Sequence, residues 1–158
     1  AGFQIMGDWA KGEFTAAGKV PGVDYYCSPT PSNNGYLYNV DSFIFYKTSD
    51  PEKQEGQKLL AKLMMGKNFQ KVFNLYKGSI PARLDVPMDE FDKCAKTSNA
   101  DIKTAGAKGG LVPSFAHGMA QGNTMKAALQ DIITEHFNSD MSSVDAANAL
   151  ADSVLANM

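Results

Sequence analysis

The strongest strand signal in the sequence is Tyr36-Leu37-Tyr38-Asn39-Val40-Asp41-Ser42-Phe43-Ile44-Phe45-Tyr46, a run dense in aromatic and β-branched residues. Two polar residues, Asn39 and Asp41, interrupt this run, and the two-residue period of a strand places them on one face. A carboxylate accepts hydrogen bonds from two hydroxyls and an amide both donates and accepts, so the pair suits a polyol ligand. The alternative is that both side chains bond loop backbone near the start of the strand.

Helix signals dominate the remainder of the chain. We predict helices after a Ser49 or Asp50 cap, across residues 69–75 up to Gly78, across residues 89–96 and 119–137, and after a Ser142 cap. Further short strands are predicted only at residues 3–6 and 25–27, and residues 105–110 are predicted to be a flexible connector. The fold class is therefore α/β, with few strands, mostly helices and a sheet too thin to stand alone. We expect the missing strands to lie on another segment of the same parent chain.

Composition and charge narrow the class of protein. The 158 residues are 44% hydrophobic and 20% charged, which is ordinary for a globular chain, and the formal net charge is -2. Nucleic acid is not expected as a partner, because no basic cluster stands out. No apolar run reaches the about 18 residues that span a bilayer, and no secretory signal peptide is recognisable. The chain opens on Ala1 without Met, so we expect a processed product or a piece of something longer.

Three further residues stand where a side chain can project into a cleft. Trp9 is the only tryptophan and follows a predicted strand-to-helix corner; its alternative reading is a core or hinge residue. Lys77 precedes a loop whose Gly78 and Pro81 could aim its ammonium at a ligand; otherwise it is a solvated helix-end lysine. His117 lies at the start of the predicted long helix, where it could contact a hydroxyl or could be an ordinary cap or surface histidine.

No pattern in the sequence predicts catalysis. There is no GxSxG, HExxH, P-loop or GxGxxG motif, and no nucleophile stands beside a base. Cys27 and Cys94 are far apart and lack a CxxC spacing, which argues against a zinc site and leaves a disulfide or two free thiols open. We expect neither a metal nor a cofactor.

Four motifs, taken in order, resemble the family 1 extracellular solute-binding proteins. They are Gln4-Ile5-Met6-Gly7-Asp8-Trp9-Ala10-Lys11-Gly12, Tyr38-Asn39-Val40-Asp41-Ser42-Phe43, Lys77-Gly78-Ser79-Ile80-Pro81-Ala82-Arg83 and Pro113-Ser114-Phe115-Ala116-His117-Gly118. Within that family, the chain is most similar to the glucose/mannose-binding branch. The resemblance extends over nearly the whole chain.

The resemblance implies a type II periplasmic-binding-protein fold, in which two α/β lobes close over a sugar. Residues 1–158 would be its C-terminal portion, without the N-terminal segment and the signal peptide of a periplasmic protein. Trp9 would stack on the sugar ring, while Asn39, Asp41, Lys77 and His117 would contact hydroxyls or the ring. The resemblance also implies a disulfide between the two cysteines.

The expected partners are a monosaccharide such as glucose, the permease of an ABC transporter, and the missing N-terminal segment or another copy of the chain. The competing hypothesis from the residues is a truncated fragment that acts only as a structural or self-associating module.

Overall fold

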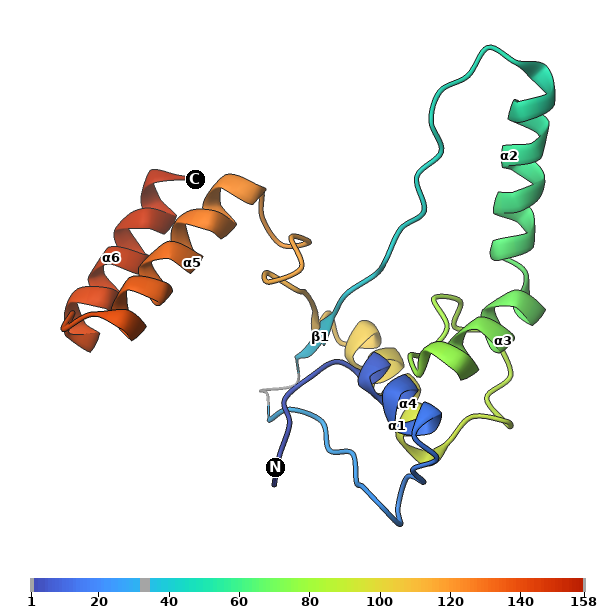
Figure 1. The fold of residues 1–158 in the computed structure, drawn as a ribbon, viewed down its shortest axis with the longest axis horizontal. Coiled ribbons are helices and arrows are strands. Elements are labelled where there is room, and N and C mark those ends of the chain that lie inside the picture. The colour runs from blue at the N-terminus through green and yellow to red at the C-terminus, as the bar shows by residue number, and fades with distance from the viewer. Residues whose placement is uncertain (1, 32–34, 158) are drawn as a thin grey trace. The chain divides into compact units, whose positions relative to one another are not determined.

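The computed structural model describes residues 2–31 and 35–157 and divides the chain into two compact units. The first comprises Ala1–Tyr36 and Val40–Leu111, and the second comprises Leu37–Asn39 and Val112–Met158. The predicted class is confirmed, because the described chain is mixed α/β, mostly helical, and has one small sheet (Figure 1).

The first unit holds a short helical turn and four helices. These are the 3₁₀ helix η1 (Asp8–Ala10), α1 (Lys11–Ala16), α2 (Pro51–Met64), α3 (Lys67–Lys77) and α4 (Lys93–Ala107). Its core is small and is centred on Val86, Phe91 and Ala95, with Leu75 and Ile80 packed against it. The loop after α3 and the start of α4 therefore meet around one apolar cluster.

Local chemistry explains where these helices begin and end. The Asp50 carboxylate accepts hydrogen bonds from the backbone N–H groups of Glu52 and Lys53, so α2 begins at Pro51 as predicted. Gly78 ends α3 with a φ of 87°, a left-handed conformation that glycine adopts without a steric penalty.

The helix predicted for residues 89–96 lies further along the chain. Asp92, rather than Asp89, caps it by accepting from the Ala95 N–H at 2.8 Å, so α4 begins at Lys93. The helix continues to Ala107 because its last turns are alanine-rich, and the flexible connector predicted from residue 105 is therefore wrong at its start.

The long predicted strand is much shorter in the structure. The sheet in the described part of the chain pairs β1 (Tyr36–Tyr38) with β2 (Leu111–Pro113), which the sequence did not predict. Residues 39–50 form neither helix nor strand, so the prediction that Asn39 and Asp41 share a strand face is wrong. A strand extends only as far as its hydrogen-bonding partner, and β2 is three residues long.

The other predicted strands are also absent from the described residues. Residues 3–6 are irregular, and within residues 25–27 only Tyr25 forms an isolated bridge, with Pro21. Short alternating runs need a neighbouring strand to satisfy their backbone, and these have none that the structure describes.

A disulfide links Cys27 to Cys94 inside the first unit, as the family resemblance implied. It ties the irregular segment after α1 to the first turn of α4, across a sequence separation of 67 residues. Closing a loop of this length lowers the conformational entropy of the unfolded chain, which raises its free energy by about 4 kcal/mol.

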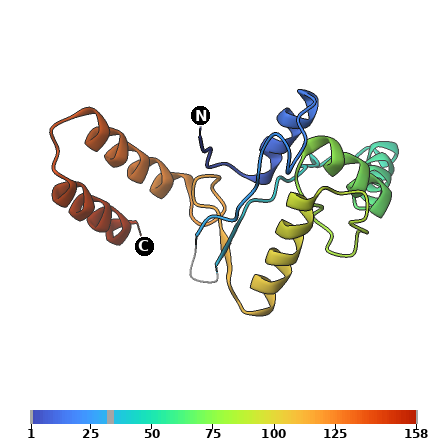
Figure 2. The ribbon, with the colours of Figure 1, turned by 90° about the horizontal axis from the view of Figure 1, so that it is seen from below.

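The second unit is mainly a helical hairpin of α5 (Asn123–Asn138) and α6 (Ser143–Ala156), which lie side by side in both ribbon views (Figures 1 and 2). Met125 and Ala146 are its buried apolar side chains. Ser142 caps α6 by accepting from the Asp145 N–H, as predicted. None of the helices that the structure describes has the length and apolar character needed to cross a bilayer.

Candidate functional site

Trp9 lies in η1, immediately before α1, at the corner that the sequence predicted. Its half-buried ring packs so closely over Gly7 that a Cβ at Gly7 would overlap it. Any residue other than glycine at position 7 would push the ring away. The absence of a side chain at position 7 therefore leaves room for the indole, and among residues 2–8 no strand precedes the corner.

Lys11, the first residue of α1, ties the same corner to α4 through Asp92. It is only 4% exposed, and its ammonium lies 2.9 Å from the Asp92 carboxylate. Burial opposes ionisation of Asp92, but the Ala95 N–H and the Lys11 ammonium outweigh it, so the pKa of Asp92 lies below its ordinary value. One carboxylate thus caps α4 and neutralises a buried charge at the start of α1.

Two glycines bring α1 and the end of α3 into backbone contact. A Cβ at Gly12 would lie 2.6 Å from the Lys77 carbonyl oxygen, and one at Gly78 would overlap the Gly12 nitrogen. Side chains at either position would force the elements apart. This explains why the motifs around residues 7–12 and 77–83 each contain a glycine at this point.

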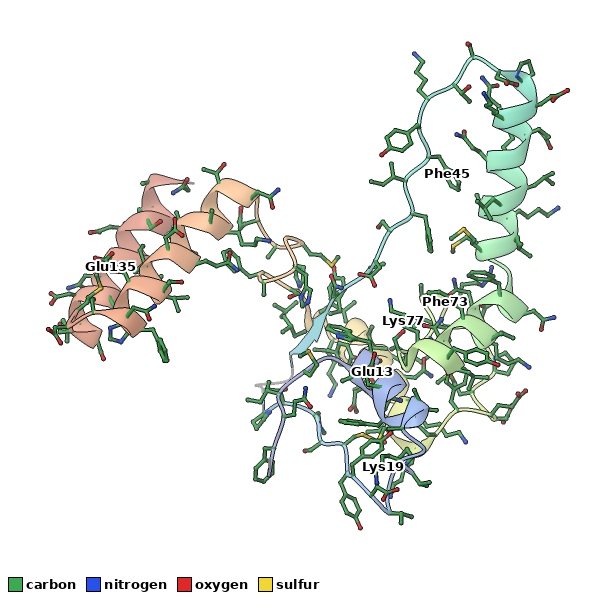
Figure 3. The ribbon with its side chains drawn as sticks, viewed as in Figure 1. Glu13, Lys19, Phe45, Phe73, Lys77 and Glu135 are labelled. Carbon is green, nitrogen blue, oxygen red and sulfur yellow. A yellow bond between two sulfur atoms is a disulfide. The ribbon has the colours of Figure 1, made fainter. Side chains whose placement is uncertain are left out.

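Lys77 and Asp41 meet directly. The Lys77 ammonium donates to Asp41 Oδ2, and it also lies 5.7 Å above the centre of the Phe73 ring (Figure 3). The Lys77 side chain is 32% exposed and that of Asp41 is 66% exposed, so both keep access to solvent. An ammonium donates hydrogen bonds and a carboxylate accepts them, so both members of the pair are groups that can bind hydroxyls.

Asp8 is a site residue that the sequence analysis did not single out. Its carboxylate accepts from the Ile80 N–H at 3.0 Å, across 72 residues. Burial raises the pKa of Asp8, and the Ile80 N–H and the ammonium groups of Lys11 and Lys77 only partly offset this effect. Nothing local marks Asp8, because its partner is supplied by the distant loop after α3.

Tyr36 is a second group that sequence reasoning missed. Its phenol bonds the Ser98 hydroxyl of α4 at 2.5 Å. Burial raises the pKa of Tyr36, and the negative charges of Asp8 and Asp101 add to that increase while Ser98 opposes it. The first unit therefore holds Trp9 and the Lys77–Asp41 pair, and Asp8 is hydrogen-bonded to the turn after Lys77.

Asn39 and His117 belong to the second unit. Asn39 is half-buried and follows Tyr38, whose carbonyl accepts from the Ser114 N–H at 2.8 Å. The buried Ser114 hydroxyl lies 2.7 Å from His117 Nδ1, which fixes the exposed imidazole. His117 does not begin a helix, because α5 starts at Asn123 and Gly118 turns the chain with a φ of 73°.

The described side chains supply binding groups of a particular kind. In the first unit these are one indole, one carboxylate and one ammonium, groups that can stack on a ring or exchange hydrogen bonds with hydroxyls; the second unit holds one amide and one imidazole. Among residues 2–31 and 35–157, no group of three or more His, Cys, Asp and Glu side chains could hold a metal ion.

Comparison with known proteins identifies similar chains, although no protein-family model matches. The chain is 45% identical over 155 residues to a probable sugar-binding periplasmic protein of Brucella suis, which is 98% of this chain and 37% of that protein. A protein of the same description from Rhizobium meliloti is 42% identical over the same shares.

A more distant relative has a related description. An uncharacterized ABC transporter extracellular-binding protein of Pyrococcus horikoshii is 37% identical over 136 residues, 85% of this chain and 30% of that protein. The chain thus spans about a third of the length of these curated relatives, between 30% and 37%.

Proposed function

We propose that this chain is part of the substrate-binding component of a bacterial ABC importer, and that it binds a hexose such as glucose without catalysis. The observation that carries the proposal is the 42–45% identity, over 98% of the chain, to proteins described as sugar-binding and periplasmic. The chain would act in the periplasm and would deliver its sugar to a membrane permease. Residues 1–158 would be the C-terminal portion of a two-lobed receptor.

The contacts in the first unit support a sugar site. The Trp9 indole offers a flat apolar face of the kind that stacks on the C–H surface of a pyranose. Asp41 and Lys77 are already paired and partly exposed, so a sugar hydroxyl can donate to the carboxylate and accept from the ammonium without either charge losing its partner. Asn39 and His117, which lie in the second unit, are proposed as sugar-binding residues on the family resemblance alone.

The exposed apolar side chains of the first unit support a further polypeptide partner. Phe43, Ile44 and Tyr46 are 63%, 77% and 82% exposed. Figure 3 shows Phe45 on the same segment, with its side chain directed toward α2. Apolar surface of this extent is rarely left in water. We assign its cover to the remaining two thirds of the relatives' length, the segment N-terminal to this chain in the proposed receptor.

Isothermal titration with glucose tests the proposal. The chain is titrated alone and after mixing with the part of the Brucella suis relative that this chain does not match. Heat of binding in either setting supports the proposal. Wild-type protein that folds, associates with the added polypeptide and still gives no heat with glucose, galactose or mannose contradicts it.

The same exposed surface also favours one alternative. The chain would then be a structural or self-associating module that covers its apolar segment with a second copy and binds no sugar. Light scattering separates the two, because the alternative predicts a stable dimer whose mass and melting temperature do not respond to sugar. The receptor proposal predicts that the added polypeptide displaces any such dimer.

A further inference from the structure

The segment carrying Trp9 and the turn carrying Lys77 are fastened together at two points. Asp8 accepts from the Ile80 N–H at 3.0 Å, and Gly12 lies against the Lys77 carbonyl. Lys11, between these two contacts, is held to Asp92 of the neighbouring helix α4. The glycine contact sets the distance between the two backbones, whereas the Asp8 contact holds the turn after Lys77 through a side chain.

The Asp8 carboxylate acts in this tie as the acceptor of a backbone hydrogen bond. Accepting one backbone N–H needs a single oxygen, which asparagine supplies without a charge. Burial of the Asp8 carboxylate raises its pKa, so its ionised form is disfavoured in the folded chain. The charged groups that face it are the ammonium groups of Lys11 and Lys77, with the Tyr36 phenol also nearby.

Lys77 therefore lies between two carboxylates. Asp41 receives its ammonium directly on the solvent side, and Asp8 lies within electrostatic reach beside the turn that follows it. A lysine side chain has several rotatable bonds and is otherwise free to adopt many conformations. The Asp41 carboxylate holds the ammonium at the tip of the side chain, and Asp8 holds the backbone of the following turn through the Ile80 N–H.

We infer that Asp8 is a positioning residue, which ties the Lys77-Gly78-Ser79-Ile80 turn to the Trp9 corner and so sets the spacing between the indole and the Lys77–Asp41 pair. Asp8 does this without contacting the ligand. The inference rests on the proposed function for its purpose, but the tie itself exists in the ligand-free chain and can be measured there.

Two ligand-free readouts test the tie. Amide hydrogen exchange of the Ile80 N–H reports the hydrogen bond, and the emission of Trp9, the only tryptophan, reports the corner. We expect Asp8→Ala to accelerate Ile80 exchange about tenfold and to shift Trp9 emission to longer wavelength. Asp8→Asn keeps an acceptor oxygen and should restore both readouts.

Asp50→Ala is the matched control. Asp50 also accepts backbone N–H groups, those of Glu52 and Lys53, but it caps α2. Its loss should lower stability while leaving Ile80 exchange and Trp9 emission as in the wild type. If Asp8→Ala does not fold, Asp8→Asn decides the question. It keeps the acceptor oxygen, so Ile80 exchange and Trp9 emission should match the wild type, and a shift of either would overturn the inference.

A third readout is the dissociation constant for glucose, measured for each variant. The dissociation constant should rise about tenfold in Asp8→Ala, and by less in Asp8→Asn, with no change in Asp50→Ala. Unaltered Ile80 exchange and Trp9 emission in Asp8→Ala would overturn the inference, as would failure of Asp8→Asn to restore them. If Asp8→Ala shows both ligand-free effects while the wild type, associated with the added polypeptide, gives no heat with glucose, galactose or mannose, the proposed function is refuted and the tie stands.

Discussion

Removing the two partners of the Lys11–Asp92 ion pair should have very unequal consequences. The Lys11 side chain is 5% exposed, whereas that of Asp92 is 34% exposed and also caps α4. Asp92→Ala leaves a buried ammonium without a partner, which costs about 3–5 kcal/mol, and loses a helix cap worth about 1 kcal/mol. The expected loss in the free energy of unfolding is therefore about 4–6 kcal/mol.

Lys11→Met should cost far less. Methionine keeps the aliphatic stem in the buried position and removes the charge, while Asp92 stays solvated and still accepts from the Ala95 N–H. We expect a loss of about 1 kcal/mol, and the Lys11→Met, Asp92→Asn double variant should be little worse. Urea unfolding followed by Trp9 fluorescence measures all three variants under the same conditions. A Lys11→Met variant as destabilised as Asp92→Ala would refute the reasoning.

Three further expectations concern stability. Replacing both Cys27 and Cys94 with serine should lower the free energy of unfolding by about 4 kcal/mol, and calorimetry would contradict this if the melting temperature were unchanged. Gly78→Ala should be more destabilising than Gly109→Ala, since both glycines have positive φ but only Gly78 meets another backbone; equal losses in urea unfolding would argue against that contact. Burial raises the pKa of Asp8, so its protonation favours folding: this contribution is fully present below the pKa of about 4 in the unfolded chain and is lost as the pH rises through the pKa in the folded chain. Asp8→Asn should therefore be more stable than the wild type at pH 7 and should lose that gain near pH 4. A constant difference in stability across this range in parallel urea titrations would refute the assignment.

The helices could be predicted from sequence because their signals are local. Asp50 with Pro51 marks the start of α2, and Gly78 marks the end of α3, within one or two residues of the observed bounds. The long strand could not be predicted correctly. Its residues have strand-forming side chains, but the ladder needs a partner, and residues 40–46 have no neighbouring strand in the part of the chain that the structure describes.

The candidate site could be predicted only in part, because some of its residues depend on partners that are distant in the sequence. Trp9, Asp41 and Lys77 stand out as an aromatic and two charges at breaks in a pattern, and the structure pairs the two charges. Asp8 and Lys11 do not stand out, because their partners Ile80 and Asp92 lie 72 and 81 residues away. A supporting residue of this kind is recognised only when the fold brings its partner to it.

The most direct test of the sugar-binding account is the affinity for glucose of wild type, Asp41→Asn and Lys77→Met, each titrated in the presence of the complementary polypeptide. Both substitutions keep the size of the side chain and remove one charge of the exposed pair. The account predicts heat of binding in the wild type and a loss of affinity of about tenfold or more in each variant, with the far-ultraviolet circular dichroism unchanged. Wild-type affinity in both variants would contradict it.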